Sequence, residues 1–220
     1  MDRIISITGK ASLKQKVDQI EMGLVLDKLD KDYQKAYQKA ASDLKQLQEV
    51  LQGLGFAEDE CKTQDFNVST EYESQRDKDG NYRDVFKGYR LSHSLQLTFP
   101  FDPIRLNAVL AGISSLKAKP QLNVRFTVAD KEACRKQLLK KAAADARQKA
   151  QLLSEELGAQ LAEIMEIRYE NGGYDFYSPT RYGTGAMLKN ARAEEALDAM
   201  SFAPEDVRIS DTVSCIWKLQ

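Results

Sequence analysis

The residues that could do chemistry in this chain are few and scattered. His93 is the single histidine, and it lies on the apolar side of an alternating segment, so we expect a packed or hydrogen-bonded histidine. A catalytic triad or a metal site would have to form without a second histidine. Cys61, Cys134 and Cys215 show no CxxC or Cys/His spacing, so we expect buried or half-buried free thiols rather than zinc ligands or disulfides.

Other catalytic signatures are missing from the sequence as well. Carboxylates are plentiful, but none recurs at a spacing that singles out an acid/base pair. The segment GTGAML, residues 183–188, lacks the third glycine of a dinucleotide-binding loop, and no GxxxxGK[ST] occurs. The sequence therefore offers no catalytic constellation, and we expect no catalytic residue, no metal and no cofactor. An enzyme with an unrecognised carboxylate site is a less favoured alternative.

One segment is unusually rich in aromatic residues and glycines. YENGGYDFYSPTRYGTGAM starts at Tyr169, and its pattern predicts a long loop over residues 170–200. Tyrosine offers a large contact area at low entropic cost, which favours an interface or a ligand contact. The alternative is a loop folded over the protein's own core. The candidate interface residues here are Tyr169, Tyr174, Phe176, Tyr177 and Tyr182.

A second candidate interface is an alanine-rich helix around KKAAADARQKAQLLSEELGA, residues 140–159. Its predicted apolar stripe carries methyl groups where larger side chains are usual, which indicates close approach of a neighbour. We expect that neighbour to be the protein's own sheet, and the alternative is a seam between two copies that includes Ala143, Ala146 and Ala150. The predicted stripe comprises Leu139, Ala143, Ala146, Ala150, Leu153 and Leu157.

Composition excludes several classes of protein. The formal net charge is −1, so no whole-molecule field attracts nucleic acid, and the basic cluster in the alanine-rich helix is expected to be a solvated face. Hydrophobic residues make up 42% and charged residues 30%, which is typical of a soluble globular protein. No apolar run approaches the roughly 18–20 residues that span a bilayer.

The elements that must position these residues follow from apolar periodicity. Between Val17 and Val128 the predicted order is strand, helix, strand, strand, helix, strand, which is the βαββαβ order of a ferredoxin-like unit. The first helix is predicted over about Asp30 to Leu54 with Asp30 as its N-cap, and Asp102-Pro103 opens the second. The expected fold class is α+β, a ferredoxin-like βαββαβ unit plus a second, smaller α/β unit completed by the C-terminal strands.

The predicted domain boundaries follow from this order. A ferredoxin-like unit is expected over residues 14–128, and a second α+β unit with the aromatic loop over residues 129–220. The short first strand, within residues 1–13, can join the second sheet and make that domain discontinuous.

The ordered set of segments resembles the SIMPL-domain family nearly from end to end. The similar segments are ISITGKAS, LQGLGFAEDECKTQDFNVSTEYE, GYRLSHSLQLTF, AAADARQKAQLLSEELGAQLAEIMEI and FAPEDVRISDTVSCIWKL. The alanine-rich helix running through Leu157-Gly158 into a strand is the most recognisable of them. The resemblance implies an α+β fold and a non-enzymatic role, with no catalytic residue to carry over.

The resemblance also implies a cellular setting. Members of the family are typically bacterial envelope or periplasmic proteins, some linked to oxidative stress and some forming large homo-oligomers. We expect a self-assembling structural or stress-associated protein, and the alternative is a small-ligand or partner-peptide binding module that uses the Tyr-rich loop 169–185. The expected partners are further copies of the chain or an unidentified protein. An envelope address is expected if a leader was removed, and a cytoplasmic one if the chain is complete as given.

Overall fold

The computed structural model describes residues 3–76, 81–170, 172–183 and 202–220. These residues form an α+β protein with three α-helices and eight strands in two antiparallel sheets. The chain divides into two compact units. Unit 1 comprises Met1–Asp18, Thr127–Pro179 and Pro204–Gln220, and unit 2 comprises Gln19–Phe126 and Thr180–Ala203.

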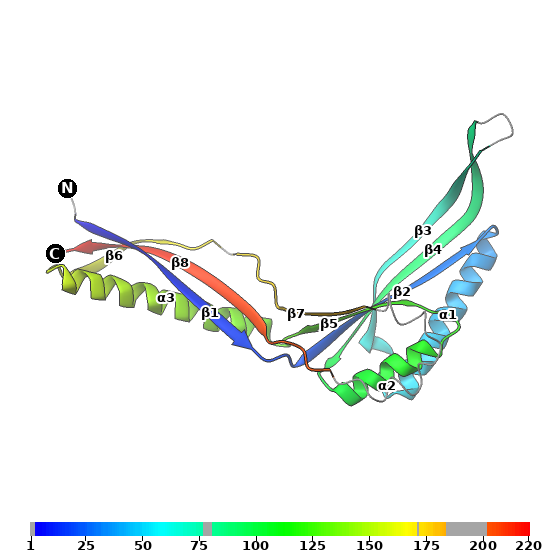
Figure 1. Cartoon of the computed structure of the whole chain (residues 1–220), viewed down its shortest axis with the longest axis horizontal. Helices are drawn as coiled ribbons and strands as arrows, with labels where there is room; N and C mark the ends of the chain where they lie inside the picture. Colours follow the sequence, from blue (N-terminus) through cyan, green and yellow to red (C-terminus); the bar gives the residue numbers. More distant parts are fainter. Residues whose placement is uncertain (1–2, 77–80, 171, 184–201) are drawn as a thin grey trace. The chain divides into compact units, whose positions relative to one another are not determined.

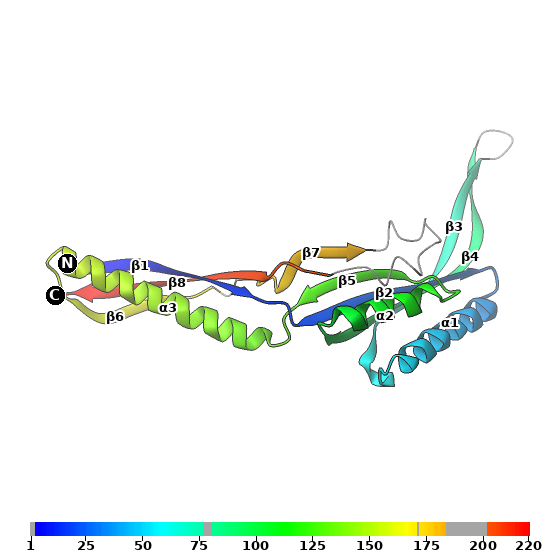
Figure 2. The same cartoon turned by 60° about the horizontal axis from the view of Figure 1, so that its bottom comes forward.

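Unit 1 is a three-stranded sheet covered on one face by one long helix (Figures 1 and 2). Its strands are ordered β1-β8-β6, and the central strand β8 is antiparallel to both neighbours. Strands β1 and β8 pair along the whole length of β1, from Ile4 opposite Lys218 to Gln15 opposite Val207. The elements are β1 (Ile4–Gln15), α3 (Lys131–Glu156), β6 (Leu161–Arg168) and β8 (Val207–Leu219).

The second sheet has five strands in the order β3-β4-β2-β5-β7, and α1 and α2 lie on the same face of it (Figure 2). Strand β4 is antiparallel to both β2 and β3. The elements are β2 (Gln19–Asp30), α1 (Tyr33–Gly53), a 3-10 turn (Glu58–Glu60), β3 (Cys61–Arg76), β4 (Tyr82–Pro100), α2 (Pro103–Ser114), β5 (Gln121–Thr127) and β7 (Tyr177–Gly183).

The core of unit 2 lies between this sheet and its two helices. The first strand predicted after Val17 is present as β2, and it buries every second side chain, since Ile20, Met22, Leu24 and Leu26 are all buried. The helices bury their own apolar rows against them: Leu47 and Leu51 from α1, and Leu106, Val109, Leu110 and Ile113 from α2. Every second residue of β4 from Leu91 to Phe99 adds to this core except His93, which is half-buried.

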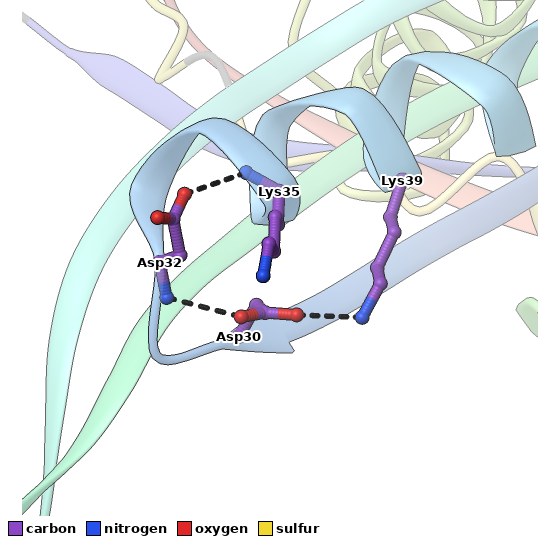
Figure 3. A network of polar contacts seen from close by, with 4 residues as sticks. All are labelled: Asp30, Asp32, Lys35 and Lys39. Carbon is purple, nitrogen blue, oxygen red and sulfur yellow. Dashed lines mark hydrogen bonds and ion pairs between the residues drawn. The ribbon is translucent and has the colours of Figure 1, made fainter.

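The start of α1 differs from the prediction by two residues. The N-cap is Asp32, whose Oδ1 accepts from the backbone N–H of Lys35 at 3.0 Å, and Asp30 is the last residue of β2 (Figure 3). Asp30 instead accepts from the backbone N–H of Asp32 at 3.0 Å and from Nζ of Lys39 at 2.6 Å, and these two donors lower its pKa. Both aspartates are good caps by type, so sequence alone did not choose between them.

Two further predictions need correction. The first strand extends to Gln15, beyond the short strand predicted within residues 1–13, because β8 pairs with all of it. The loop predicted over 170–200 contains a strand, β7, next to β5, since a free sheet edge can recruit a segment that lacks clear alternation. Residues 170 and 172–176 form no helix or strand, as expected, and residues 171 and 184–200 of the predicted loop lie outside the described residues. By contrast, Asp102 caps α2 with Pro103 at its first turn, as predicted.

None of the helices in the described part of the chain is both long and apolar enough to cross a membrane.

Candidate functional site

The alanine-rich helix lies hard against its own sheet because of one glycine. A Cβ built on Gly9 in β1 would overlap the carbonyl oxygen of Ala142 and lie 2.5 Å from the backbone nitrogen of Ala146. Strand and helix backbones are therefore in direct contact here, and the carboxylate of Asp145 accepts from the backbone N–H of Lys10 at 2.7 Å. A larger residue on either side would force them apart.

The stripe that faces the sheet is not the predicted one. It rises in steps of four through Cys134, Leu138, Ala142, Ala146, Ala150 and Ser154. Ala146 and Ala150 are buried as expected, but Ala143 is exposed, and Leu139, Leu153 and Leu157 also reach solvent. The predicted stripe advances in steps of three and four, which suits a helix that packs through a broad apolar face. Here the backbone of β1 is so close that only one narrow row of small side chains fits between helix and sheet.

The aromatic residues of the predicted loop are divided between two places. Tyr169 and Tyr174 converge on the carboxylate of Asp211 in β8, which is 7% exposed. Both hydroxyls donate to its Oδ2, that of Tyr169 at 3.1 Å, and the two hydroxyl oxygens lie 2.7 Å apart. Burial together with the hydrogen bond to Asp211 raises the pKa of Tyr174. This cluster ties the segment after β6 to β8.

The side chain of Phe176 lies in the core of unit 1 and is only 4% exposed, so it is not available for contact with a partner. The guanidinium of Arg135 lies 5.2 Å from the centre of its ring, and the Nζ of Lys131 lies 5.2 Å from the ring of Tyr177. Tyr182, in β7, packs edge-on against Phe202 at 5.3 Å. The structure thus joins Tyr169 to Tyr174 within unit 1, whereas Tyr182 belongs to unit 2.

His93 and the cysteines make no reactive cluster among the described residues. The Nε2 of His93 lies 2.8 Å from Oγ1 of Thr63, its ring packs edge-on against Phe66 at 5.3 Å, and burial lowers its pKa. All three cysteines are free, as expected, and burial raises each thiol's pKa. No group of three potential metal ligands is found in the described parts of the chain.

The hairpin of β3 and β4 carries several exposed aromatic side chains: those of Phe66, Tyr72, Tyr82 and Phe86. Strand β2 ends opposite Tyr89, so beyond that point β3 and β4 continue as a two-stranded ribbon (Figure 1). Cross-strand pairing places Tyr72 opposite Phe86 and Arg76 opposite Tyr82. We call one face of this hairpin the aromatic row; its members are Phe66, Val68, Tyr72, Tyr82, Phe86 and Tyr89.

The rings of the aromatic row contact one another in sequence. Tyr72 meets Phe86 at 5.6 Å, Phe86 meets Tyr89 at 5.3 Å, and Tyr89 meets Tyr33 of α1 at 5.6 Å. The row begins next to the buried Leu91 and ends at Tyr82, which is 73% exposed. It is thus a continuation of the core face of β4 beyond the helices that cover the rest of it.

The opposite face of the hairpin is charged. Arg90 donates from Nε to Glu71 at 2.6 Å and from one terminal nitrogen to Asp27 at 2.9 Å, and Lys87 lies 3.6 Å from Glu73. The hairpin is therefore amphipathic, with an ion-paired face and an apolar face. Sequence reasoning did not identify this face as a candidate site, although Phe66, Val68 and Tyr72 follow the alternation of a strand.

Comparison with known proteins adds the family. The sequence profile of SIMPL, described as a protein of unknown function (DUF541), matches residues 5–217. The chain belongs to the SIMPL family. This match spans both units and all eight strands except the first residue of β1 and the last two of β8. No curated protein matches the chain.

Proposed function

We propose that this SIMPL protein is a non-enzymatic, self-assembling protein, and that copies associate through the aromatic row of the β3–β4 hairpin. One observation carries the proposal: Tyr72, Tyr82 and Phe86 of the row lie on a two-stranded ribbon, and their apolar face has no covering helix or strand among the described residues. A two-stranded hairpin is marginally stable alone in water, and exposed apolar patches of this kind mark interaction sites.

The size of the row suits an interface between copies. Aromatic side chains bury roughly 150–250 Å² each, so the exposed parts of Phe66, Val68, Tyr72, Tyr82 and Phe86 amount to roughly 400–500 Å². A stable interface buries about 800 Å² per partner, of which a little over half is apolar. The row therefore provides about the apolar share that such an interface needs.

Charge favours a second copy over a partner of strong opposite charge. On the ribbon, the face that bears the row also carries Asp84 and Arg76, whereas Glu71, Glu73 and Lys87 lie on the opposite face. A two-fold arrangement of two ribbons brings the same patch of each copy together, so acids of one ribbon can meet bases of the other while both rows are covered.

The test is the mass of the chain in solution, measured by light scattering from low micromolar to several hundred micromolar. The wild type is expected to form a discrete oligomer of the 24.8 kDa chain. A Tyr72→Lys/Tyr82→Lys variant should be monomeric, because it places like charges where two rows would meet. The matched control is Ile104→Lys on α2, where the side chain is 81% exposed but far from the row in sequence; it should retain the oligomer. A strictly monomeric wild type, or an oligomer that survives the double substitution, would contradict the proposal.

The arrangement β3-β4-β2-β5 with α1 and α2 on one face also supports the ferredoxin-like description of this unit, which we propose for these four strands. The fifth strand and the extended hairpin are additions to that plan.

The stress-associated role, the envelope or periplasmic address and the alternative role of residues 169–185 in binding stay predictions. Cell fractionation of the tagged natural gene product tests the address. Ligand-dependent protection of Tyr174 and Tyr177 from chemical modification tests the binding alternative, and it should be absent if the hairpin alone carries the function.

A further inference from the structure

Unit 1 contains an open groove of about 860 Å³ between α3 and β6. Its floor is the helix-facing side of β8, with Val213, Cys215 and Trp217. Exposed apolar side chains of Ile164 and Ile167 form the β6 wall. The whole lining comes from unit 1, so the groove is independent of the aromatic row.

The groove exists because α3 is held to one side of its sheet. The contact of Gly9 with Ala142 and Ala146 draws the helix toward β1 and β8. A helix with its side chains is about 10 Å wide and strands are about 4.8 Å apart, so one helix covers about two strands. The third strand, β6, is left beside the helix rather than beneath it.

The helix wall of the groove is divided by polarity. Leu139 and Ala143 line one half, and Arg147, Gln151 and Glu155 line the other. Glu155 lies eight helical residues beyond Arg147, about 12 Å along the axis, where its Oε1 accepts from Nε2 of Gln151 at 2.9 Å. Arg147 forms no ion pair with a carboxylate in the described residues. The groove therefore offers a guanidinium with no carboxylate partner at the border of its apolar half, with the carboxylate of Glu155 at the far end.

We propose that this groove binds an anionic amphiphile, a carboxylate with an unbranched alkyl chain. The carboxylate would accept from the guanidinium of Arg147, which suits a planar two-oxygen acceptor. The alkyl chain would lie toward Leu139 and Ile167. Eight helical residues separate Arg147 from Leu139, so this half of the groove is about 12 Å long, which suits a chain of medium length. The volume lies within the range of small-molecule sites, about 300–1,000 Å³.

The groove is proposed for binding and not for reaction. Cys215 is buried in its floor, and burial raises the pKa of the thiol, so the unreactive neutral form predominates at neutral pH. The alkyl chain would cover side chains such as Ile167, now 61% exposed, and release the water on them.

The experiment is titration of the full chain with decanoate, below the concentration at which it forms micelles. Trp217 is the only tryptophan, so its fluorescence reports on the groove directly, and calorimetry gives the dissociation constant. We expect saturable binding with one site per chain, tighter for decanoate than for hexanoate. Decyltrimethylammonium, which has the same chain and the opposite charge, should bind at least about tenfold more weakly.

Two pairs of variants make the test specific. Arg147→Gln should weaken decanoate binding about tenfold or more, whereas Lys140→Gln, on the same helix but outside the lining, should leave it unchanged. Ala143→Phe should block the groove, whereas Ala144→Phe, which is exposed and outside the lining, should not. Circular dichroism checks that each variant is folded.

Absence of saturable binding to the wild type would overturn the proposal, and so would binding that Arg147→Gln and Ala143→Phe leave unchanged. A third result would also overturn the proposal: the wild type binds no decanoate, and the Ala143→Phe variant has a lower mass in solution than the wild type. That combination would show that a second copy of the chain covers the groove. The monomeric hairpin variant should bind decanoate as the wild type does, so failure here and failure of self-assembly are separate results.

Discussion

At the scale of single residues, Gly9 decides how closely helix and sheet approach in unit 1. Any side chain there would enter the backbone of α3 between Ala142 and Ala146. Gly88 likewise permits a close approach in unit 2, between β4 and the end of β2. Its φ is +153°, and a Cβ on it would lie 2.5 Å from the carbonyl oxygen of Asp30. Gly88 also sits at the irregular pairing of β3 with β4 between Glu71 and Tyr72, where the hairpin leaves β2.

A buried carboxylate makes Tyr174 structurally important. Its hydroxyl and that of Tyr169 both donate to Asp211, so Tyr174→Phe leaves this carboxylate with one fewer donor. We expect a loss of about 1–3 kcal/mol in the free energy of unfolding at pH 7. Urea unfolding followed by Trp217 fluorescence measures it. Tyr82→Phe, at a 73% exposed position, is the control and should be neutral; equal effects from both changes would argue against the cluster.

At the scale of elements, α3 combines a single buried row with a large exposed surface. The row of Ala142, Ala146 and Ala150 packs on Val213, Cys215 and Trp217 of β8. Because that row consists of methyl groups, the helix sits low on β1 and β8 and leaves β6 open. The same feature thus produces both the tight core of unit 1 and the groove beside it.

Ala146→Leu tests the tightness of this packing. Three extra carbon atoms at a fully buried position should overpack the contact with β1 and cost about 1–3 kcal/mol of stability. Ala144→Leu is the matched control, since Ala144 is exposed on the same helix and leucine is almost as good a helix former as alanine. Thermal melting by circular dichroism compares the two. An unchanged melting temperature for Ala146→Leu would show that the contact can relax.

At the scale of the whole molecule, each of the two compact units has its own core. Unit 1 is assembled from segments far apart in the chain, since β1 and β8 pair along their length although they lie at opposite ends of the sequence. The core of unit 2 comes from one continuous stretch, Gln19–Phe126, with the described end of β7 added at the sheet edge. Separate cores allow separate local stabilities.

Hydrogen exchange read by mass spectrometry tests this separation. Gly9→Ala should speed exchange in α3, β1 and β8 while leaving β2 and β4 near the wild-type rate, because its clash lies entirely within unit 1. Gly88→Ala should have the opposite pattern, since its clash is with Asp30 in unit 2. Faster exchange across both units in either variant would indicate that the two cores unfold together.

Much of the fold was predictable from local patterns. Alternation marked β2 and β4, apolar spacing marked the helices, and Asp102-Pro103 marked the start of α2. Family membership was predictable too, because it depends on an ordered set of segments rather than on any one contact. The start of α1 was missed because Asp30 and Asp32 are equally suited to capping by type, and the hydrogen bonds in Figure 3 depend on where β2 ends.

The candidate sites were less predictable. The sequence shows that Tyr169, Tyr174 and Phe176 are aromatic, but not that Asp211 binds the first two hydroxyls or that the third is buried. It shows alternation in Phe66, Val68 and Tyr72, but not that the covering helices stop short of Tyr72. These contacts and exposures depend on which segments become neighbours in the folded chain. The periodicity of apolar residues does not predict which segments these are.

By itself, then, the sequence determined the periodic elements, the capped start of α2, the α+β class and the family, because these follow from side-chain type and spacing along a few turns of chain. Only the tertiary structure decided that Gly9 meets α3, that β6 is left uncovered beside it, and that the aromatic row extends past its helices. The physical reason is that close packing joins separate segments of the chain, such as Gly9 with Ala142, and their mutual fit exists only once the chain is folded.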